Sequence, residues 1–257
     1  MSAMAIAPPL DADDVQVWEV RLGRVGRDVA RFWRVLSEPE RSRARRFRFA
    51  RDRRRYVVMR GVLRTLLGRH LDVSPARVRF GRAARGKPVL AEPAADVRFN
   101  VTHAGAVGLV AFALGRDVGV DVERPNAAVD PLSLAGHFFA PSEVARLRSL
   151  PEEQRERAFL ECWTRKEAYT KALGLGLFLP LDSFEVAFGP GVEPALVAAA
   201  DPDADGRRFA VLGLPAPRGY VGALVVEKHT PDEAFSFVGE SAECLAYAAV
   251  RPDAQGR

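Results

Sequence analysis

The sequence predicts an α+β protein built from two halves that meet near residues 115–120. Two observations support this prediction. Patterns typical of a strand, helices and further strands follow one another, and then helices and strands occur again. The length of 257 residues accommodates one large domain or two modest ones, at about 100–200 residues per domain. The halves show no close sequence repeat, so the prediction depends on the order of the elements.

The predicted first half opens with a strand over residues 15–22, where valines alternate with other side chains. Two helices are expected next. The first, over 37–49, has Ser37 as a suitable N-cap residue, and the second, over 52–71, repeats apolar residues at helical spacing. The remaining predicted elements of this half are strands over 78–80, 88–90, 97–102 and 106–114.

The predicted second half begins with a strand over 118–123. A helix over 132–150 is interrupted near Pro141, and a longer helix over 151–173 ends where Gly174 permits a left-handed turn. Further strands are predicted over 184–188, 208–212 and 220–226.

Composition excludes several classes of protein. No uninterrupted apolar run approaches the roughly 18–20 residues of a membrane-spanning helix, so we expect no membrane partner. Residues 1–14 lack the basic start of a signal peptide, and Pro8 and Pro9 interrupt their apolar part. Cys162 and Cys244 are too few for a disulfide framework. We therefore expect a cytoplasmic protein with reduced thiols, of which Cys162 belongs to the core.

Lysine is rare in this sequence. Of 38 Lys and Arg residues, only Lys87, Lys166, Lys171 and Lys228 are lysines. An ammonium group is a compact point charge, whereas a guanidinium group is a broad planar fork. The few lysines are therefore candidates for positions where arginine would not serve.

Two carboxylates occur in the segment Gly119-Val120-Asp121-Val122-Glu123. Because alternate side chains of a strand share a face, Asp121 and Glu123 point the same way, roughly 6.6–7 Å apart along the backbone. Adjacent carboxylates repel each other unless a cation or protons intervene, and a hard cation such as Mg²⁺ suits oxygen ligands. Taken alone, the pattern also fits a solvated strand face.

The long predicted helix carries a lysine within an apolar stripe. Lys166 falls in the middle of that stripe, Glu167 lies on its flank, and Lys171 follows one turn later. If the stripe faces an interior cleft, these groups meet a charged ligand. In the alternative, Lys166 extends to solvent and Glu167 pairs with Lys171 on the surface, which is worth about 0.3–0.5 kcal/mol.

A third group of polar residues comes from Gly86-Lys87-Pro88 and Phe99-Asn100-Val101-Thr102-His103. Thr102 and His103 end a predicted strand just before a turn, where their donors can reach a bound anion. A purely structural histidine and a simple turn at Lys87 are the alternatives.

Residues 41–55 contain nine arginines and a single acidic residue, Asp52. Such stretches bind nucleic-acid phosphates, small phosphorylated ligands or acidic proteins, or they cover a solvated helix face. The aromatic residues nearby are only Phe47, Phe49 and Tyr56, which is few for stacking on bases. A nucleic-acid-binding protein would also leave the carboxylate motif unexplained, so we expect no nucleic-acid partner.

Taken in order, these motifs resemble those of the 4'-phosphopantetheinyl transferase superfamily, in particular its larger surfactin-type (Sfp-like) members. The resemblance spans roughly residues 36–190. The matching segments are Gly86-Lys87-Pro88, Phe99-Asn100-Val101-Thr102-His103, Val118-Gly119-Val120-Asp121-Val122-Glu123, and Trp163-Thr164-Arg165-Lys166-Glu167-Ala168 with Lys171. Where the family often has Ser-His-Ser, this chain has Thr102-His103-Ala104, which keeps the first hydroxyl and loses the second.

The resemblance implies transfer of the 4'-phosphopantetheine moiety of coenzyme A to a serine hydroxyl of an apo acyl, peptidyl or polyketide carrier protein, with release of adenosine 3',5'-bisphosphate. It implies that Asp121, Glu123 and Glu167 hold Mg²⁺ against the pyrophosphate. Glu167 and Lys171 are the implied catalytic residues, as base for the serine proton and as counter-charge. The implied coenzyme A contacts are Arg43, Arg55, Lys87, Thr102, His103, Lys166 and Lys171.

The fold implied by the resemblance is an α+β pseudo-dimer, two similar halves with the active site in the cleft between them. We expect an N-terminal half over residues 1–116, a C-terminal half over 117–228 and a tail over 229–257. One chain with two halves can act as a monomer. A relative that binds coenzyme A without catalysis is the remaining alternative, and the complete set of carboxylates argues against it.

Overall fold

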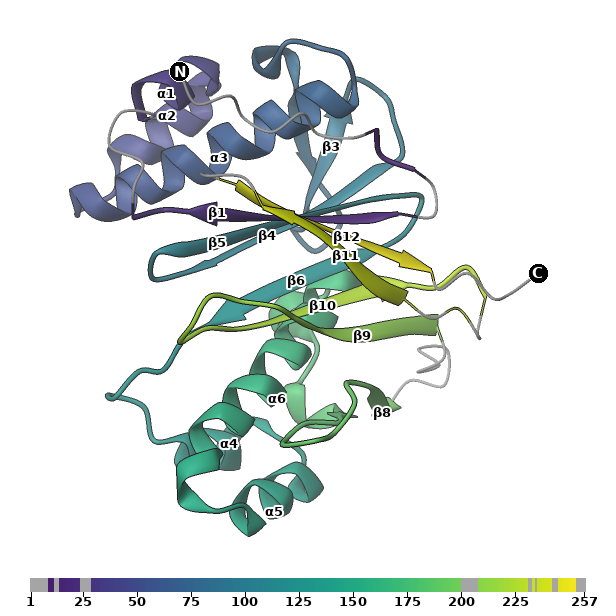
Figure 1. Cartoon of the computed structure of the whole chain (residues 1–257). Coiled ribbons are helices and arrows are strands. Elements are labelled where there is room, and N and C mark those ends of the chain that lie inside the picture. The colour runs from purple at the N-terminus through teal and green to yellow at the C-terminus, as the bar shows by residue number, and fades with distance from the viewer. Residues whose placement is uncertain are drawn as a thin grey trace.

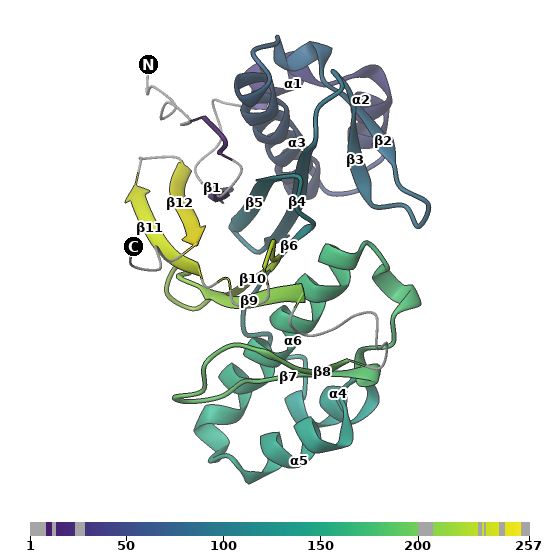
Figure 2. The same ribbon diagram turned by 90° about the vertical axis from the view of Figure 1, so that its right-hand side faces the viewer.

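The computed structural model describes residues 9–11, 14–23, 29–199, 208–230, 233, 235–241 and 245–252, and Cys244 lies outside these ranges. Four layers are stacked in Figure 1: helices of the N-terminal half, a five-stranded sheet, a three-stranded sheet, and helices of the C-terminal half. Figure 2 shows the same stack from the side, with the last two strands at one margin. The two sheets therefore form the middle of the molecule.

The N-terminal half packs three helices on a sheet with the strand order β11-β12-β1-β5-β4. Its helices are α1 (Val29–Val35), α2 (Glu38–Arg45) and α3 (Ala50–His70). Its sheet strands are β1 (Val15–Arg21), β4 (Val97–Ala104), β5 (Val107–Leu114), β11 (Phe235–Ser241) and β12 (Leu245–Pro252). The short helix η1 (Pro75–Arg77) leads into a hairpin of β2 (Arg79–Arg82) and β3 (Pro88–Glu92).

The C-terminal half packs its helices on the sheet β6-β10-β9. The strands are β6 (Val118–Glu123), β9 (Phe209–Leu214) and β10 (Val221–Glu227), and the helices are α4 (Pro131–Phe138), α5 (Pro141–Ser149) and α6 (Glu152–Leu173). After α6 come the short helices η2 (Gly176–Phe178) and η3 (Leu181–Ser183) and the hairpin of β7 (Phe184–Val186) and β8 (Leu196–Ala199).

The same arrangement of elements occurs in both halves. β1-β5-β4 and β6-β10-β9 are both antiparallel, and one long helix, α3 or α6, packs on each. The predicted α+β pseudo-dimer is confirmed by this repetition. The halves share a similar backbone frame even though their sequences show no close repeat.

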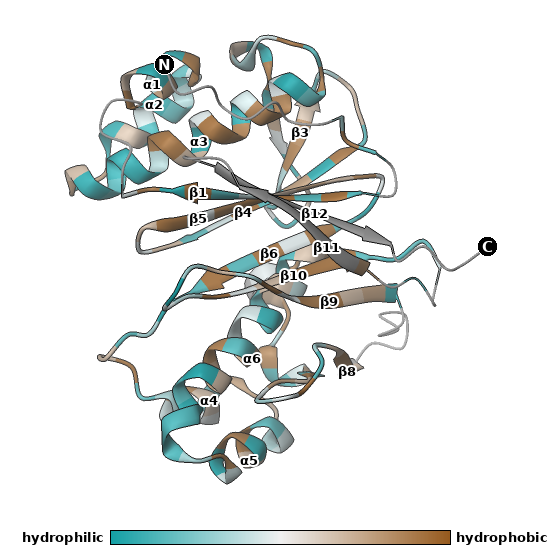
Figure 3. Ribbon diagram, viewed as in Figure 1, coloured by the Kyte–Doolittle hydropathy of each residue, from teal (hydrophilic) through white to brown (hydrophobic). Residues whose placement is uncertain are grey.

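Apolar side chains from the facing sheets form a core between the halves. Val17, Ala111, Val120 and Leu224 are among the buried residues of this layer, and brown residues mark the middle strands in Figure 3. Where β4 and β6 meet, the Asn100 Oδ1 accepts a hydrogen bond of 3.0 Å from the backbone N–H of Val120. This contact fixes β6, and therefore the carboxylate motif, against the N-terminal half.

Several elements differ from the sequence-based expectations. Helix α1 and the strands β8, β11 and β12 were not predicted, and α2 already ends at Arg45. The linker to α3 is held by Phe47, whose ring lies 5.3 Å from that of Tyr56. Cys162 is buried as expected. Among the described helices, none is long and apolar enough to span a membrane.

Candidate active site

Helix α6 and strand β6 approach each other closely beside the carboxylate motif. At Gly119 the backbone of β6 runs against α6, and a Cβ there would overlap the carbonyl oxygen of Ala168 and the amide nitrogen of Ala172. Packing therefore requires glycine at this position. The close approach brings Lys171 of α6 opposite Asp121 of β6.

Asp121 lies at the centre of a small polar cluster. Its Oδ1 is 2.5 Å from Lys171 Nζ and accepts a hydrogen bond of 2.9 Å from Thr102 Oγ1. The carboxylate is buried, and its Oδ2 has no hydrogen-bond partner among the described residues. A buried oxygen without a partner is costly, so this atom is suited to receive a cation or a ligand donor.

Two further carboxylates share the environment of Asp121. Burial, and next the charge of Asp121, raise the pKa of Glu123 to about 7. Burial also raises the pKa of Glu167, and the charge of Asp121 adds to this increase. Burial raises the pKa of Asp121 itself, although Lys171 acts in the opposite direction. Within the described ranges, no group of three His, Cys, Asp or Glu side chains is assembled as a metal site. The three carboxylates are therefore electrostatically coupled without being gathered around one point.

His103 and Arg55 extend the cluster toward α3. Burial, and then the charge of Arg55, lower the pKa of His103, with a smaller contribution from Lys171. Arg55 also lies 3.4 Å from Asp52. The N-terminal part of α3 thus borders the polar cluster on the side of the N-terminal half.

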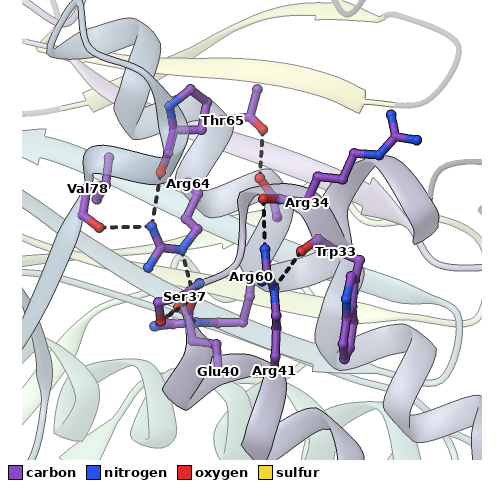
Figure 4. A network of polar contacts seen from close by, with 11 residues as sticks. Trp33, Arg34, Ser37, Glu40, Arg41, Arg60, Arg64, Thr65 and Val78 are labelled. Carbon is purple, nitrogen blue, oxygen red and sulfur yellow. Dashed lines mark hydrogen bonds and ion pairs between the residues drawn. The ribbon is translucent and has the colours of Figure 1, made fainter.

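A cavity of about 490 Å³ opens between α2, α3 and the β2–β3 hairpin. Its lining includes six arginines, namely Arg43, Arg46, Arg60, Arg64, Arg79 and Arg82. Glu40 is the one acidic residue in the described lining, and it lies 2.8 Å from Arg60 and 2.7 Å from Arg64. Figure 4 shows this network at the start of α2, with Ser37 beside Glu40.

The other arginines of the cavity are available to an anion. Arg43, Arg46, Arg79 and Arg82 have no acidic partner among the described residues, and the Arg43 guanidinium lies 5.4 Å from the centre of the Tyr56 ring. Guanidinium groups bind phosphate oxygens in pairs of hydrogen bonds. The cavity therefore suits a phosphorylated ligand, and the predicted residue Arg43 lies at it.

The prediction that Lys166 contacts a ligand is wrong. Its side chain is fully buried in the C-terminal half, where Nζ lies 2.7 Å from Glu143 Oε2. Nζ also donates hydrogen bonds to the carbonyl oxygens of Leu181 and Phe184, at 2.7 and 2.5 Å. The apolar stripe around Lys166 packs into the core, and the ammonium group is neutralised there instead of in the cleft.

Lys87 is held by backbone groups of the C-terminal half. Its Nζ donates to the carbonyl oxygens of Val118 and Ala172, at 3.3 and 2.8 Å, and lies 3.8 Å from Asp117. Burial lowers the pKa of this lysine. The ammonium group holds the β2–β3 hairpin to the C-terminal half, so we assign Lys87 a role in joining the halves.

An apolar groove of about 170 Å³ runs beside Glu123. Its walls include Pro131 and Leu134 from α4 and Phe159 and Trp163 from α6. Of the three coupled carboxylates, Glu123 lines the groove, and the other lining residues belong to the C-terminal half.

Sequence reasoning missed the glutamates that organise both halves. The spacing from Ser37 to Glu40 is that of a capping box, which predicts a helix start at α2 but not the ion pair with Arg64. Arg79 and Arg82 on the β2–β3 hairpin were missed as well, because their position beside α2 depends on tertiary packing.

The coupled carboxylates and the arginine-lined cavity are features suited to a phosphorylated ligand and its counter-ion. Residues 117–225 match the family model described as the 4'-phosphopantetheinyl transferase superfamily, and residues 25–114 match that of the 4'-phosphopantetheinyl transferase N-terminal region. The 4'-phosphopantetheinyl transferase HetI of a Nostoc species is 39% identical over 191 residues, which cover 74% of this chain and 80% of HetI. The chain belongs to the 4'-phosphopantetheinyl transferase superfamily.

Other members of the family are similar over shorter stretches. The 4'-phosphopantetheinyl transferase Sfp of Bacillus subtilis is 30% identical over 156 residues, 61% of this chain and 68% of Sfp. Among solved structures, the holo-[acyl-carrier-protein] synthase of Thermotoga maritima aligns with a TM-score of 0.36 and 22% identity, over 53% of this chain and 84% of that one.

Proposed function

We propose that this protein transfers the 4'-phosphopantetheine moiety of coenzyme A to a serine hydroxyl of an apo carrier protein. The observation that carries the proposal is the contact of Asp121 with both Lys171 and Thr102, beside the coupled carboxylates of Glu123 and Glu167. Family membership supports the same reaction, since HetI and Sfp are named 4'-phosphopantetheinyl transferases.

The nucleotide end of coenzyme A would occupy the arginine cavity. Arg43, Arg46, Arg79 and Arg82 would bind the 3'-phosphate. Arg55 of α3 acts on His103, which also feels the charge of Lys171, and both residues would bind phosphate oxygens near the reacting bond. The apolar groove beside Glu123 is suited to the phosphopantetheine arm.

The reaction needs a base, a counter-charge and an oriented phosphate. The serine Oγ would form a bond to the phosphorus of the pantetheine phosphate while the bond from that phosphorus to the bridging oxygen breaks. Glu167 would take the serine proton, either directly or through a water molecule. Lys171 would offset the charge that develops on the departing adenosine 3',5'-bisphosphate, and Thr102 would orient the phosphate through its hydroxyl.

We further propose that Asp121, Glu123 and Glu167 hold Mg²⁺. Asp121 Oδ2, which has no hydrogen-bond partner in the described ranges, and the mutual repulsion of the three carboxylates fit a hard cation with oxygen ligands. When bound, the cation would neutralise charge on the pyrophosphate. Lys171 already forms an ion pair with Asp121 in the structure, and this pair favours the charged form of the carboxylate, which is the form that binds a cation.

A monomer in the cytoplasm is the state we propose for the working enzyme. The polar cluster is assembled from one chain, since Asp121 of β6 contacts Lys171 of α6 and Thr102 of β4. Acyl, peptidyl and polyketide carriers each offer a serine hydroxyl to this cluster.

Intact-protein mass spectrometry tests the proposal. The protein is incubated with an apo carrier protein, coenzyme A and Mg²⁺, and a parallel sample contains EDTA. We expect the carrier to gain one phosphopantetheinyl group, with an equal amount of adenosine 3',5'-bisphosphate released, and we expect EDTA to abolish the gain.

Other results would point elsewhere. Coenzyme A binding with no transfer to acyl, peptidyl or polyketide carriers would identify a binding protein without catalysis. RNA that competes with coenzyme A would instead assign the arginines to nucleic acid. Transfer that persists in EDTA would remove Mg²⁺ from the proposal while leaving the reaction.

A further inference from the structure

The linker before α3 and the first turn of this helix form an exposed basic surface with one aromatic ring in it. We call Arg48, Phe49, Arg51, Arg53 and Arg54 the Arg48–Arg54 surface. The Phe49 side chain is 57% exposed, and the Arg48 guanidinium lies 5.3 Å from its ring centre. Figure 3 shows hydrophilic colours gathered at this end of α3. The Phe49 ring is therefore exposed to solvent and surrounded by positively charged side chains.

This surface is separate from the arginines assigned to the ligand. Arg43 and Arg46 line the cavity, and Arg55 lies near Asp52 and His103. In contrast, Arg48, Arg53 and Arg54 have no acidic partner in the part of the chain that the structure describes, while Arg51 lies 3.4 Å from Asp52 with its side chain 68% exposed. Nothing within the described protein accounts for this concentration of charge.

The Arg48–Arg54 surface works against the stability of its own helix. The N-terminus of a helix carries a partial positive charge, so cations in the first turn are unfavourable there. Arg51, Arg53 and Arg54 all lie in the first five residues of α3, with Asp52 as the acidic residue of that turn. Residues that break a local rule in this way are expected at functional sites.

The position of the surface connects it to the cleft. Arg55 follows Arg54 directly, and its charge acts on His103, which also senses Lys171. In Figure 1, the N-terminal end of α3 and the end of β6 from which the chain leaves toward α4 lie on the same side of the molecule. A macromolecule seated on the Arg48–Arg54 surface would therefore lie at the rim of the reacting centre.

We propose that the Arg48–Arg54 surface docks an acidic face of the carrier protein during transfer. This inference rests on the proposed function. Arginine forks pair with Asp and Glu carboxylates in bidentate geometry, and opposite charges on two proteins accelerate and orient their encounter. Phe49 supplies the single apolar anchor that such an interface places at its centre. The surface selects the protein substrate, whereas the arginine cavity selects the nucleotide.

Charge reversal tests the inference by steady-state kinetics on a carrier that the wild-type protein modifies. For Arg51→Glu/Arg54→Glu we expect the KM for the carrier to rise at least about tenfold. The KM for coenzyme A and the kcat should stay within about twofold. The matched control is Arg148→Glu/Arg157→Glu on α5 and α6, which changes the net charge equally and should leave the carrier KM unchanged.

Two further measurements distinguish docking from misfolding. Glutamate is favourable in the first turn of a helix, so the melting temperature of Arg51→Glu/Arg54→Glu should equal or exceed that of the wild type. Phe49→Ser should raise the carrier KM without lowering the melting temperature, because the ring is exposed. A carrier whose acidic residues are changed to lysine should regain a low KM with the charge-reversed enzyme.

The outcomes separate this inference from the proposed function. If the wild type modifies no carrier, the proposed function is overturned and the inference with it. If the wild type transfers normally and the charge-reversed variant keeps the same carrier KM, only the inference is overturned. An increase confined to the KM for coenzyme A would also overturn it, by assigning these arginines to the nucleotide.

Discussion

The two halves hold their long helices by the same device, although they carry different chemistry. In the N-terminal half, Glu40 of α2 pairs with Arg64 of α3 at 2.7 Å. In the C-terminal half, Glu143 of α5 pairs with Lys166 of α6, also at 2.7 Å. Arg64 and Lys166 are each the fifteenth residue of their helix. Both glutamates are the third residue of a short helix and accept a hydrogen bond from the N-cap backbone.

The parallel continues to the segment that follows each long helix. Arg64 donates to two carbonyl oxygens, that of Pro75, which begins η1, and that of Val78, which directly follows the end of η1. Lys166 likewise donates to the carbonyl oxygen of Leu181, which begins η3, and to that of Phe184, which directly follows the end of η3. The buried ion pair thus holds the long helix to the rest of its half in both cases. Lys166 serves this structural role and therefore does not reach the Asp121 cluster.

The difference between the halves appears one residue later. The residue after Lys166 is Glu167, at the coupled carboxylates, whereas the residue after Arg64 is Thr65, whose hydroxyl donates to the Gly61 carbonyl oxygen. A repeated frame can therefore carry a reacting centre in one half and ligand-binding arginines in the other.

The largest effect on the transfer rate is expected when Glu167, the carboxylate present in only one half, is replaced. Glu167→Gln should lower the transfer rate by about 10²–10⁴-fold, because the serine loses its base, while coenzyme A binding is largely kept. The measurement is single-turnover transfer followed by mass spectrometry, together with calorimetric titration of coenzyme A. Thr65→Val, at the matching position of α3, is the control and should transfer at the wild-type rate. Wild-type turnover by Glu167→Gln would remove Glu167 from the chemistry.

The buried pairs provide the next test, by urea unfolding. Lys166→Met should lower the free energy of unfolding by about 3–5 kcal/mol, because Glu143 is left buried and uncompensated. Arg64→Met should cost less, since Arg60 remains 2.8 Å from Glu40. Adding Glu143→Gln to Lys166→Met should recover part of the loss. Equal costs in the two halves would contradict the distinction.

The halves should also respond differently to acid. Burial lowers the pKa of His70 in the N-terminal half from its usual 6.5 to about 4. Since the unfolded chain binds the proton more readily, the stability that His70 contributes is full above pH 6.5 and is lost as the pH drops from 6.5 to about 4, by up to about 3 kcal/mol. The difference in unfolding free energy between the wild type and His70→Leu should fall by this amount across the pH range, because the opposing titration of Glu123 is common to both proteins. In His137→Gln, which changes the exposed histidine of α4, the loss should be undiminished.

The smallest expected effect concerns the helix starts. Ser37 Oγ donates to Glu40 Oε2 at 3.0 Å, a bond that Ala140 cannot make to Glu143 in the other half. Ser37→Ala should therefore cost about 1 kcal/mol of unfolding free energy. Ser42→Ala, on the exposed face of α2, is the control. A cost indistinguishable from that of Ser42→Ala would show that the backbone bond to Glu40 suffices.

Local patterns predicted the elements that bury one face within their own half. The alternation in β6 and the periodicity of α6 gave bounds within one residue of those observed. β11 and β12 were not predicted, because β12 depends on pairing with β1 at the far end of the chain and β11 pairs with β12. Such non-local pairing leaves little trace in the sequence of either strand.

The site could be predicted where spacing alone decides which side chains meet. The shared face of Asp121 and Glu123 follows from the period of a strand, and Lys171 follows from the helix turn after Glu167. The prediction for Lys166 was wrong because its apolar stripe is a core face, and the sequence does not show that Glu143 of another helix meets it there. The arginine cavity depends likewise on how the β2–β3 hairpin packs beside α2.

The pairing of β12 with β1 has a consequence for synthesis on the ribosome. The two strands are joined from Val15 opposite Val250 to Val20 opposite Leu245. The backbone donors and acceptors along one edge of β1 therefore stay without their β12 partner until nearly all of the sequence has been translated. An open strand edge recruits other strands. During translation, β1 would be the place where nascent chains associate, and we expect a shielding chaperone to improve the yield of the native protein most while this edge is open.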